Sequence, residues 1–306
     1  MTPSTRPRRK SALLARSRII GVIRTFFEER GFLHMETPCR IPSPAPEPYI
    51  DALPSREWYL QTSPELAMKR LLAAGHQRIF QICRCWRDGE RGRFHLPEFT
   101  MLEWYRADAD YTDLMTDCEE LLLAVASAVT GEITLTFQGM EVQLATPADR
   151  LSVREAFRRY TTLSAEEALQ RDCFDELMVT KIEPNLGIGV PTILYDYPAA
   201  RGALARRKTD DPELAERFEL YLCGVELANA FSELTDPAEQ LERFQQDREE
   251  RSRAGKDTYT LPLPFLNELS AIPPSAGIAL GLDRLVMLFL DLPDIDDVVA
   301  FTPEEL

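Results

Sequence analysis

The chain has 306 residues, of which 44% are hydrophobic and 28% are charged, so it can bury the core of one large domain or two ordinary ones. Its formal net charge of −15 argues against extensive contact with a nucleic acid, because proteins that bind polyanions usually carry a basic surface. No apolar run approaches the roughly 18 residues of a membrane span, and the N-terminus lacks the apolar segment of a signal peptide. The composition therefore predicts a cytoplasmic protein that does not enter a membrane.

The N-terminal region holds the main concentration of basic residues. Seven arginines and lysines fall between residues 6 and 24, and no acidic residue precedes Glu28. We interpret residues 1–12 as a flexible basic arm, and favour a solvated arm over one that binds nucleic acid.

The six cysteines form no CxxC pair, and the three histidines are scattered. Cys83 and Cys85 are only two positions apart, which is too close for a usual zinc knuckle. We therefore expect free thiols, most of them buried, and no histidine-based metal site.

The first third of the chain begins with a predicted helix over 11–30, where apolar residues form a broad stripe and Gly31 suits the C-terminal end. A short extended run follows at 32–38, and a proline-rich loop at 42–48. The segment 62–65 reads Thr-Ser-Pro-Glu, which is typical of a helix start: a hydroxyl cap, a proline in the first turn and an acid near the positive end of the dipole.

The middle of the chain opens with a buried strand predicted over 78–85, a polar loop over 86–95 and a returning strand over 99–105. No internal repeat or linker is evident afterwards, so we predict one α+β domain over residues 1–306 with a central antiparallel sheet. The remaining predicted elements are helices over 111–129, 164–178, 236–254 and 282–290, and strands over 193–195, 218–223, 226–230 and 277–281.

Four segments occur in the order of the signature motifs of class II aminoacyl-tRNA synthetases. Gly31-Phe32 through Glu36-Thr37-Pro38 resembles motif 1, residues 80–105 resemble motif 2, and Gly281-Leu282-Asp283-Arg284-Leu285 resembles motif 3. Between them, Glu226–Leu234 resembles the acidic strand of the lysyl-tRNA synthetase branch. The resemblance covers nearly the whole chain and implies the class II catalytic fold, a mostly antiparallel sheet flanked by helices.

Motif 1 begins almost at the N-terminus, which leaves no room for the anticodon-binding OB domain of a lysyl-tRNA synthetase. A core without that domain resembles the elongation factor P–(R)-β-lysine ligase family, and residues 97–106 and 277–281 are especially similar to it. Lysyl-tRNA synthetases usually place glycine where Ala279 stands, and the extra methyl would reshape the amino-acid pocket. The resemblance implies that lysine or (R)-β-lysine is activated with ATP as the aminoacyl-adenylate and transferred to a lysine side chain of translation elongation factor P.

The resemblance also implies how ATP is held. Because both reactants are anions, the main tasks are positioning and charge neutralisation. Arg87 would bridge the α-phosphate and the substrate carboxylate, and Arg284 would hold the γ-phosphate. Phe99 would stack on adenine, with Arg284 over the other face, and Glu226 and Glu233 would hold Mg²⁺ between phosphates. The remaining implied ATP contacts are Asp88, Glu90, Leu227 and Gly281.

The amino-acid substrate carries two ammonium groups, which need acidic partners because an unpaired buried charge is costly. By resemblance, Glu65 contacts the backbone-side amine, while Glu103 and Glu233 contact the distal amine with help from the Tyr105 hydroxyl. Glu233 is thus a candidate for both metal and substrate. The other residues implied in this pocket are Ser63, Pro64 and Ala279.

Two positions depart from the family pattern, and both affect the ATP loop more than the amino-acid pocket. Gly89 stands where motif 2 usually has a glutamate near adenine, and Glu90 would replace it after a shift of the loop. Leu96 stands where close relatives often have asparagine. We interpret Asp283 as a structural residue at a helix start.

Two other functions stay open on the sequence. One is an atypical lysyl-tRNA synthetase whose anticodon domain is a separate chain, although the acidic charge makes tRNA an unexpected partner. The other is a non-catalytic regulatory paralogue, which need not keep the phosphate-binding residues Arg87, Glu226, Glu233 and Arg284. The resemblance further implies a homodimer with motif 1 at the interface, consistent with an apolar stripe over 13–27 that is buried on two sides.

Overall fold

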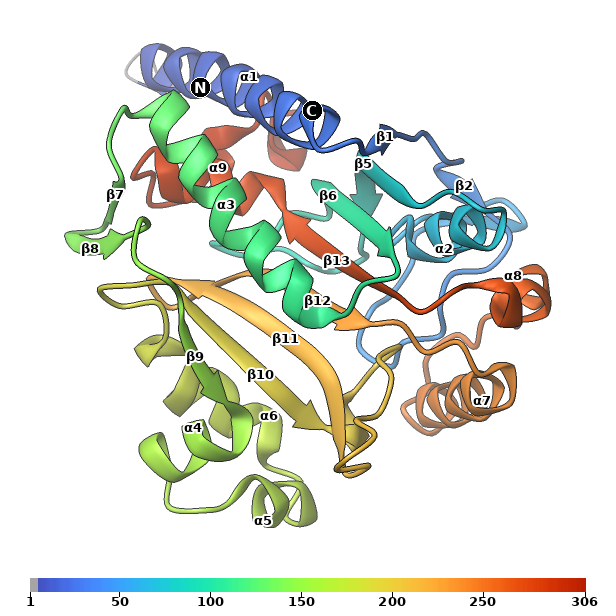
Figure 1. The fold of residues 1–306 in the computed structure, drawn as a ribbon. Coiled ribbons are helices and arrows are strands. Elements are labelled where there is room, and N and C mark those ends of the chain that lie inside the picture. Colours follow the sequence, from blue (N-terminus) through green and yellow to red (C-terminus); the bar gives the residue numbers. More distant parts are fainter. Residues whose placement is uncertain (1–4) are drawn as a thin grey trace.

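The computed structural model describes residues 5–306, with side chains from residue 9 onward. An eight-stranded sheet runs through the molecule in the order β1-β5-β6-β13-β12-β11-β10-β9 (Figure 1). Its inner pairs are antiparallel, whereas β1 and β9 pair in parallel with β5 and β10 at the two edges. This mostly antiparallel sheet with flanking helices confirms the predicted α+β fold. Its strands are β1 (Leu33–His34), β5 (Arg78–Trp86), β6 (Glu98–Ala107), β9 (Asp149–Ser152), β10 (Thr192–Pro198), β11 (Leu214–Leu222), β12 (Val225–Ser232) and β13 (Ser275–Gly281).

One face of the sheet packs on three helices, α1 (Thr5–Glu29), α3 (Tyr111–Val129) and α9 (Leu282–Phe289) (Figure 1). Alternation along β6 sends Leu102 and Trp104 into this core. Phe27 of α1 stacks on Phe80 of β5 with ring centroids 5.0 Å apart. The same alternation turns Glu103 and Tyr105 to the opposite face, which carries the candidate site.

The opposite face is flanked by α2 (Glu65–Ala73), α7 (Pro237–Arg253) and α8 (Leu263–Glu268), whose apolar residues form a second cluster with Met68, Phe244 and Phe265. A third cluster packs under β9 and β10 and includes Phe157 of α4 (Val153–Tyr160). Short strands form a three-stranded sheet, β2 (Arg40–Ile41), β3 (Pro54–Ser55) and β4 (Trp58–Leu60), and a hairpin, β7 (Thr134–Phe137) and β8 (Met140–Gln143).

The helix predicted over 164–178 is wrong in extent. The chain forms α5 (Ala165–Gln170) and α6 (Phe174–Leu177), followed by a π turn at Met178–Ile182 and a 3₁₀ turn at Glu183–Asn185. Asp172 between the two helices has φ 53°, in the left-handed region that ends an α-helix. Apolar spacing continues across this break and conceals it in the sequence.

The predicted flexible arm differs from the structure, because α1 begins at Thr5; residues 1–4 of that arm lie outside the described residues. Arg9 pairs with Glu305 at 2.7 Å, and Arg16 pairs with Asp283. The basic residues of this region therefore meet acidic residues at the other end of the chain. Short C-terminal 3₁₀ turns, Ile295–Val298 and Pro303–Glu305, supply part of this contact surface.

All six cysteines are free thiols, as predicted, but only Cys85, Cys118 and Cys223 are fully buried, whereas Cys39 is exposed. Within residues 5–306, the helices are all too short or too polar to span a bilayer.

Candidate active site

A cleft lies on the sheet face that α1, α3 and α9 leave free, and encloses about 1130 Å³ including the part open to solvent. Its floor consists of side chains that face the same way on neighbouring strands. One cross-strand row runs Glu103–Ala279–Asn229, and the next runs Tyr105–Gly277–Phe231. The walls come from the loops at 42–51, 87–96 and 199–208 and from the start of α2.

One end of the cleft is acidic. Ser63 Oγ donates to Glu103 Oε1 (2.6 Å), and the Tyr105 hydroxyl donates to Glu103 Oε2 (2.7 Å). The Lys69 ammonium is fully buried between Glu65 and Glu233, 2.5 Å from each. Three carboxyl groups thus share one protein cation, so this end carries an excess of negative charge when all three are ionised.

Burial raises the pKa of Glu103 to about 8, and the nearby charge of Glu65 adds to the shift. Burial likewise raises the pKa of Glu233 to about 8, although the Lys69 charge opposes it. Burial disfavours the charged form of Lys69, but Glu233 and Glu65 outweigh it and raise its pKa. Raised pKa values of buried carboxyl groups are expected at a site that binds a further cation as ligand.

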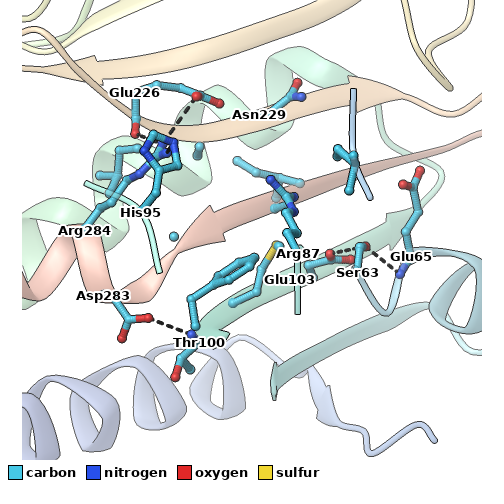
Figure 2. A pocket seen from close by; sticks show the side chains of 18 of the residues that line it. Ser63, Glu65, Arg87, His95, Thr100, Glu103, Glu226, Asn229, Asp283 and Arg284 are labelled. Atoms are coloured by element: carbon cyan, nitrogen blue, oxygen red, sulfur yellow. Dashed lines mark hydrogen bonds and ion pairs between the residues drawn. The ribbon is translucent and has the colours of Figure 1, made fainter. Parts of the chain in front are cut away.

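The opposite end of the cleft is built around Arg284 of α9. Its Nη1 donates to the Glu226 carbonyl (2.7 Å) and lies 3.3 Å from Glu226 Oε2, while Nη2 lies 2.7 Å from His95 Nε2. Figure 2 shows this group at one end and Ser63, Glu65 and Glu103 at the other, with Arg87 between them. The Arg87 guanidinium carbon lies 5.2 Å from the Phe99 ring centroid, so a cation and an aromatic ring lie side by side in the cleft.

A β-bulge aims Glu226 into the cleft. The register changes from Leu220↔Ala228 to Tyr221↔Glu226, which makes Leu227 an extra residue in β12. In a regular strand without this bulge, Glu226 and Asn229 are three positions apart and would point to opposite faces. The sequence predicted both Glu226 and Leu227 in the site but gave no sign of the bulge.

The predicted sharing of one metal ion by Glu226 and Glu233 is wrong. Seven residues along a strand separate them by about 20 Å, far beyond the reach of a common ligand. Glu226 lies beside Arg284, whereas Glu233 pairs with Lys69 and does not line the cleft directly. The spacing of seven residues could not reveal this separation, because the distance it spans depends on whether the segment is an extended strand or a helix.

The predicted residues Ser63, Glu65, Arg87, Glu103, Tyr105 and Ala279 come together in the cleft, as do Glu90, Phe99, Glu226, Leu227, Gly281 and Arg284. Pro64 and Asp88 do not line it: Pro64 caps α2, and the Asp88 amide donates to the Asp51 carbonyl. Gly89 has φ 73°, a conformation that a glutamate would adopt only with strain, and Glu90 lies in the cleft wall 3.7 Å from Arg87.

Asp283 has the structural role expected of it. Its carboxylate accepts a hydrogen bond from the Thr100 amide (2.7 Å; Figure 2) and pairs with Arg16. It thereby joins α9, β6 and α1. Leu96 lines the cleft and belongs to the main core, so the departure from asparagine places an apolar wall there.

The residues that were not predicted include Glu47, His95 and Asn229, which line the cleft, and Lys69 and Glu219, which are buried beside residues that line it. Asn229 and Glu219 extend the Glu103–Ala279 row across β12 and β11, so their signal is cross-strand register rather than sequence spacing. Lys69 lies four residues after Glu65, one helical turn along α2, and this spacing could have revealed it. Burial and the Arg284 charge lower the pKa of His95.

The chain was compared with known proteins. The family model of class II tRNA synthetases (D, K and N) matches residues 2–305. The elongation factor P–(R)-β-lysine ligase of Salmonella gallinarum (strain 287/91 / NCTC 13346) is 41% identical over 307 residues, covering 95% of this chain and 94% of that protein. Proteins of the same name from Salmonella dublin and Salmonella paratyphi B are 40% identical over 306 residues with the same coverage. The chain therefore belongs to the family of class II tRNA synthetases (D, K and N), which also includes these elongation factor P–(R)-β-lysine ligases.

Proposed function

We propose that this protein activates lysine or (R)-β-lysine with ATP and transfers it to a lysine side chain of translation elongation factor P. The observation that carries the proposal is the charge distribution of the cleft. Two guanidinium groups, of Arg87 and Arg284, face three carboxylates that share one protein cation, Lys69. This arrangement suits a triphosphate at one end and a diamine at the other, and the names of the Salmonella relatives support the acceptor.

In the first step, the substrate carboxylate attacks the α-phosphorus of ATP and pyrophosphate leaves. Arg87 lies between the two ends of the cleft, where its planar fork can hold the carboxylate and the α-phosphate together. Arg284 is expected to exchange Glu226 and His95 for the terminal phosphates, and Phe99 to stack on adenine. Holding both anions in this way lowers the cost of bringing their charges together.

The amino-acid end is expected to hold the two ammonium groups through carboxylates. Glu65 is the proposed partner of the backbone-side amine, and Glu103 and Glu233 of the distal amine. Tyr105 keeps the Glu103 carboxylate oriented through its 2.7 Å hydrogen bond. Ala279 lies between Glu103 and Asn229 in the floor, where its methyl group can shift the position of the substrate backbone.

We propose that Mg²⁺ binds with ATP beside Glu226. Within residues 5–306, groups of three or more histidine, cysteine or acidic side chains that could hold a metal are absent, which suits an ion held mainly by phosphates and water. The Glu226 side chain lines the cleft, is 39% exposed and fits Mg²⁺, which would neutralise phosphate charge when bound. Glu219 of β11 is already held by Arg217 and by the Tyr197 and Tyr221 hydroxyls.

The described residues 5–306 are proposed to act as one cytoplasmic catalytic domain that works as a homodimer. The sheet joins all three hydrophobic clusters, which supports one folding unit. Leu14 of α1 and Leu33 of β1 are 66% and 53% exposed, which supports a contact of the motif 1 region with a second copy.

The proposal is tested by two assays on the intact protein. ATP–pyrophosphate exchange with lysine or (R)-β-lysine measures activation, and labelled amino acid followed onto elongation factor P or tRNA identifies the acceptor. We expect exchange, and label on the factor. Label on tRNA alone would identify a synthetase of tRNA, and no exchange with either isomer would favour a non-catalytic paralogue.

The variant Arg87→Ala is expected to lower exchange by at least about 10²-fold with an unchanged melting temperature, because it removes a preorganised charge at the reacting phosphate. Arg154→Ala is the matched control. Arg154 is likewise an arginine beside acidic residues, pairing with Glu166 at 2.8 Å and Asp211 at 2.7 Å, but it lies outside the cleft. Exchange unchanged in Arg87→Ala would remove the role assigned to this residue.

A further inference from the structure

Glu47 lines the cleft, and none of the roles proposed above uses it. Arg251, which is 1% exposed, donates to the carbonyls of Glu47 (2.8 Å) and Ile50 (2.9 Å). The same guanidinium pairs with Asp51 at 2.7 Å, and the Asp51 carbonyl accepts from the amide of the residue after Arg87 (2.7 Å). The backbone of Glu47 is thus fixed in the cleft wall and tied to the loop that carries Arg87.

The Glu47 carboxylate has neither a hydrogen bond nor an ion pair with another residue in the part of the chain that the structure describes. Shielding from water raises its pKa to about 7, with a further rise from the charge of Glu65 and an opposing effect of Arg87. Asp247 of α7 and Arg217 of β11 are the other charged groups that act on it. These charged groups come from α2, the 87–96 loop, α7 and β11, and none of them pairs with the Glu47 carboxylate.

Glu47 lines the same cleft as two residues that hold neighbouring groups of the substrate in the proposed function. Glu65 is the partner of the backbone-side amine, and Arg87 is the partner of the carboxylate. In an amino acid these groups are separated by only one or two carbon atoms. A carboxylate that lines the cleft with both, on a segment tied to the Arg87 loop, can therefore meet an amine that attacks the carbonyl carbon in the second step.

We propose that Glu47 is the general base that deprotonates the acceptor amine before it attacks the aminoacyl-adenylate. The inference rests on the proposed function and assigns its second step. An acceptor lysine reaches the cleft as an ammonium ion, which has no free electron pair for attack. An unpaired carboxylate in the cleft wall attracts this cation and accepts a proton from it.

One proton passes from the acceptor ammonium to the Glu47 carboxylate, and the neutral nitrogen forms a bond to the carbonyl carbon. The bond between this carbon and the phosphate oxygen breaks, and AMP leaves with the electron pair. The attacking nitrogen loses its second proton to water as the amide forms, and Glu47 returns its own proton to water afterwards.

The test separates the two steps and the two kinds of nucleophile. Wild-type protein and Glu47→Gln are loaded with ATP and labelled (R)-β-lysine, and each is then mixed with elongation factor P or with hydroxylamine. Hydroxylamine is uncharged at neutral pH and needs no base to free its electron pair. We expect Glu47→Gln to lower the rate constant of transfer to the factor by about 10²–10⁴-fold. Hydroxamate formation and pyrophosphate exchange should stay within about threefold of wild type, because neither requires deprotonation of an acceptor ammonium.

Glu57→Gln is the matched control, because Glu57 is a glutamate of the same region with a 78% exposed side chain, paired only weakly with Arg40 at 3.8 Å. Glu47→Asp keeps a carboxylate and should recover part of the transfer rate. Transfer to the factor within threefold of wild type in Glu47→Gln would overturn the inference. So would an equal loss with both nucleophiles, or a raised KM for the amino acid in exchange that accounts for the loss, because either marks a substrate-binding role. Absence of exchange in the wild-type protein would instead refute the proposed function itself.

Discussion

Gly277 of β13 lies between two residues of the acidic end, Tyr105 and Glu233. A Cβ atom built on Gly277 would lie well inside contact distance of Tyr105 Cε1 and Glu233 Oε1. Both side chains belong to the buried network around the proposed distal-amine site and cannot retreat without breaking it. The glycine therefore lets a tyrosine and a glutamate meet over the sheet.

We expect Gly277→Ala to lower pyrophosphate exchange by at least about 100-fold and to raise the KM for the amino acid more than that for ATP. Overpacking a buried site costs about 1–3 kcal/mol, so a lower melting temperature should accompany the loss. Steady-state exchange and a thermal melt measure both effects. Gly21→Ala is the control, since a Cβ there meets nothing within 4 Å. Exchange near the wild-type value in Gly277→Ala would show that Tyr105 and Glu233 can move without loss of amino-acid binding.

At the residue scale, the sequence identifies chemistry better than it identifies neighbours. Arg87, Glu103 and Arg284 could be predicted because they lie inside recognisable motifs, and the structure brings them into one cleft. The pairing of Glu226 with Glu233 failed because it depends on distance along a strand. Glu219 and Glu47 were missed because one depends on cross-strand register and the other on a loop that Arg251 folds back.

At the scale of the element, two long periodic segments were predicted closely, whereas the helix over 164–178 and several short elements were not. The helix expected over 111–129 is α3, with the same bounds, and α7 differs from its expected range by one residue at each end. The short strands β2 to β4 were missed, because two or three residues carry little periodicity. Helix α4 was missed although its eight residues are amphipathic. The N-terminal helix begins earlier than expected, because its basic residues are paired with acids that only the fold brings near.

The outer side of α1 bears on the proposed homodimer. Ile19, Ile23 and Phe27 are buried in the main core, whereas Leu14 is 66% exposed. We expect a mass in solution of twice the 34.9 kDa chain, measured by light scattering. Leu14→Glu should shift the protein toward the monomer, because a charge at the centre of an apolar contact loses its hydration. Leu263→Glu, at a 57% exposed leucine of α8, should leave the mass unchanged. A wild-type mass near that of one chain would refute the dimer.

At the scale of the whole molecule, the cleft without substrate concentrates acidic groups that burial disfavours. The pKa values of Glu103 and Glu233 rise to about 8, and that of Glu47 to about 7, against about 4.3 in an unfolded chain. Between these limits, the native protein binds more protons than the unfolded one. Its stability is therefore greatest at the acid end of this window, falls as pH rises across the window, and levels off above the native pKa values.

We expect the free energy of unfolding of the ligand-free protein to fall between about pH 5 and pH 8, by up to about 1.4 kcal/mol per pH unit for each group that is protonated in the native state and ionised in the unfolded state. Saturating lysine should remove most of this slope, because its ammonium groups stabilise the same carboxylates in their charged form. Urea unfolding at several pH values, with and without lysine, measures both slopes. Glu103→Gln should reduce the ligand-free slope, whereas Glu57→Gln at an exposed site should keep it. A ligand-free slope that lysine leaves unchanged would mean that the buried carboxylates do not bind its amines, and the assignment of the acidic end to a diamine would fail.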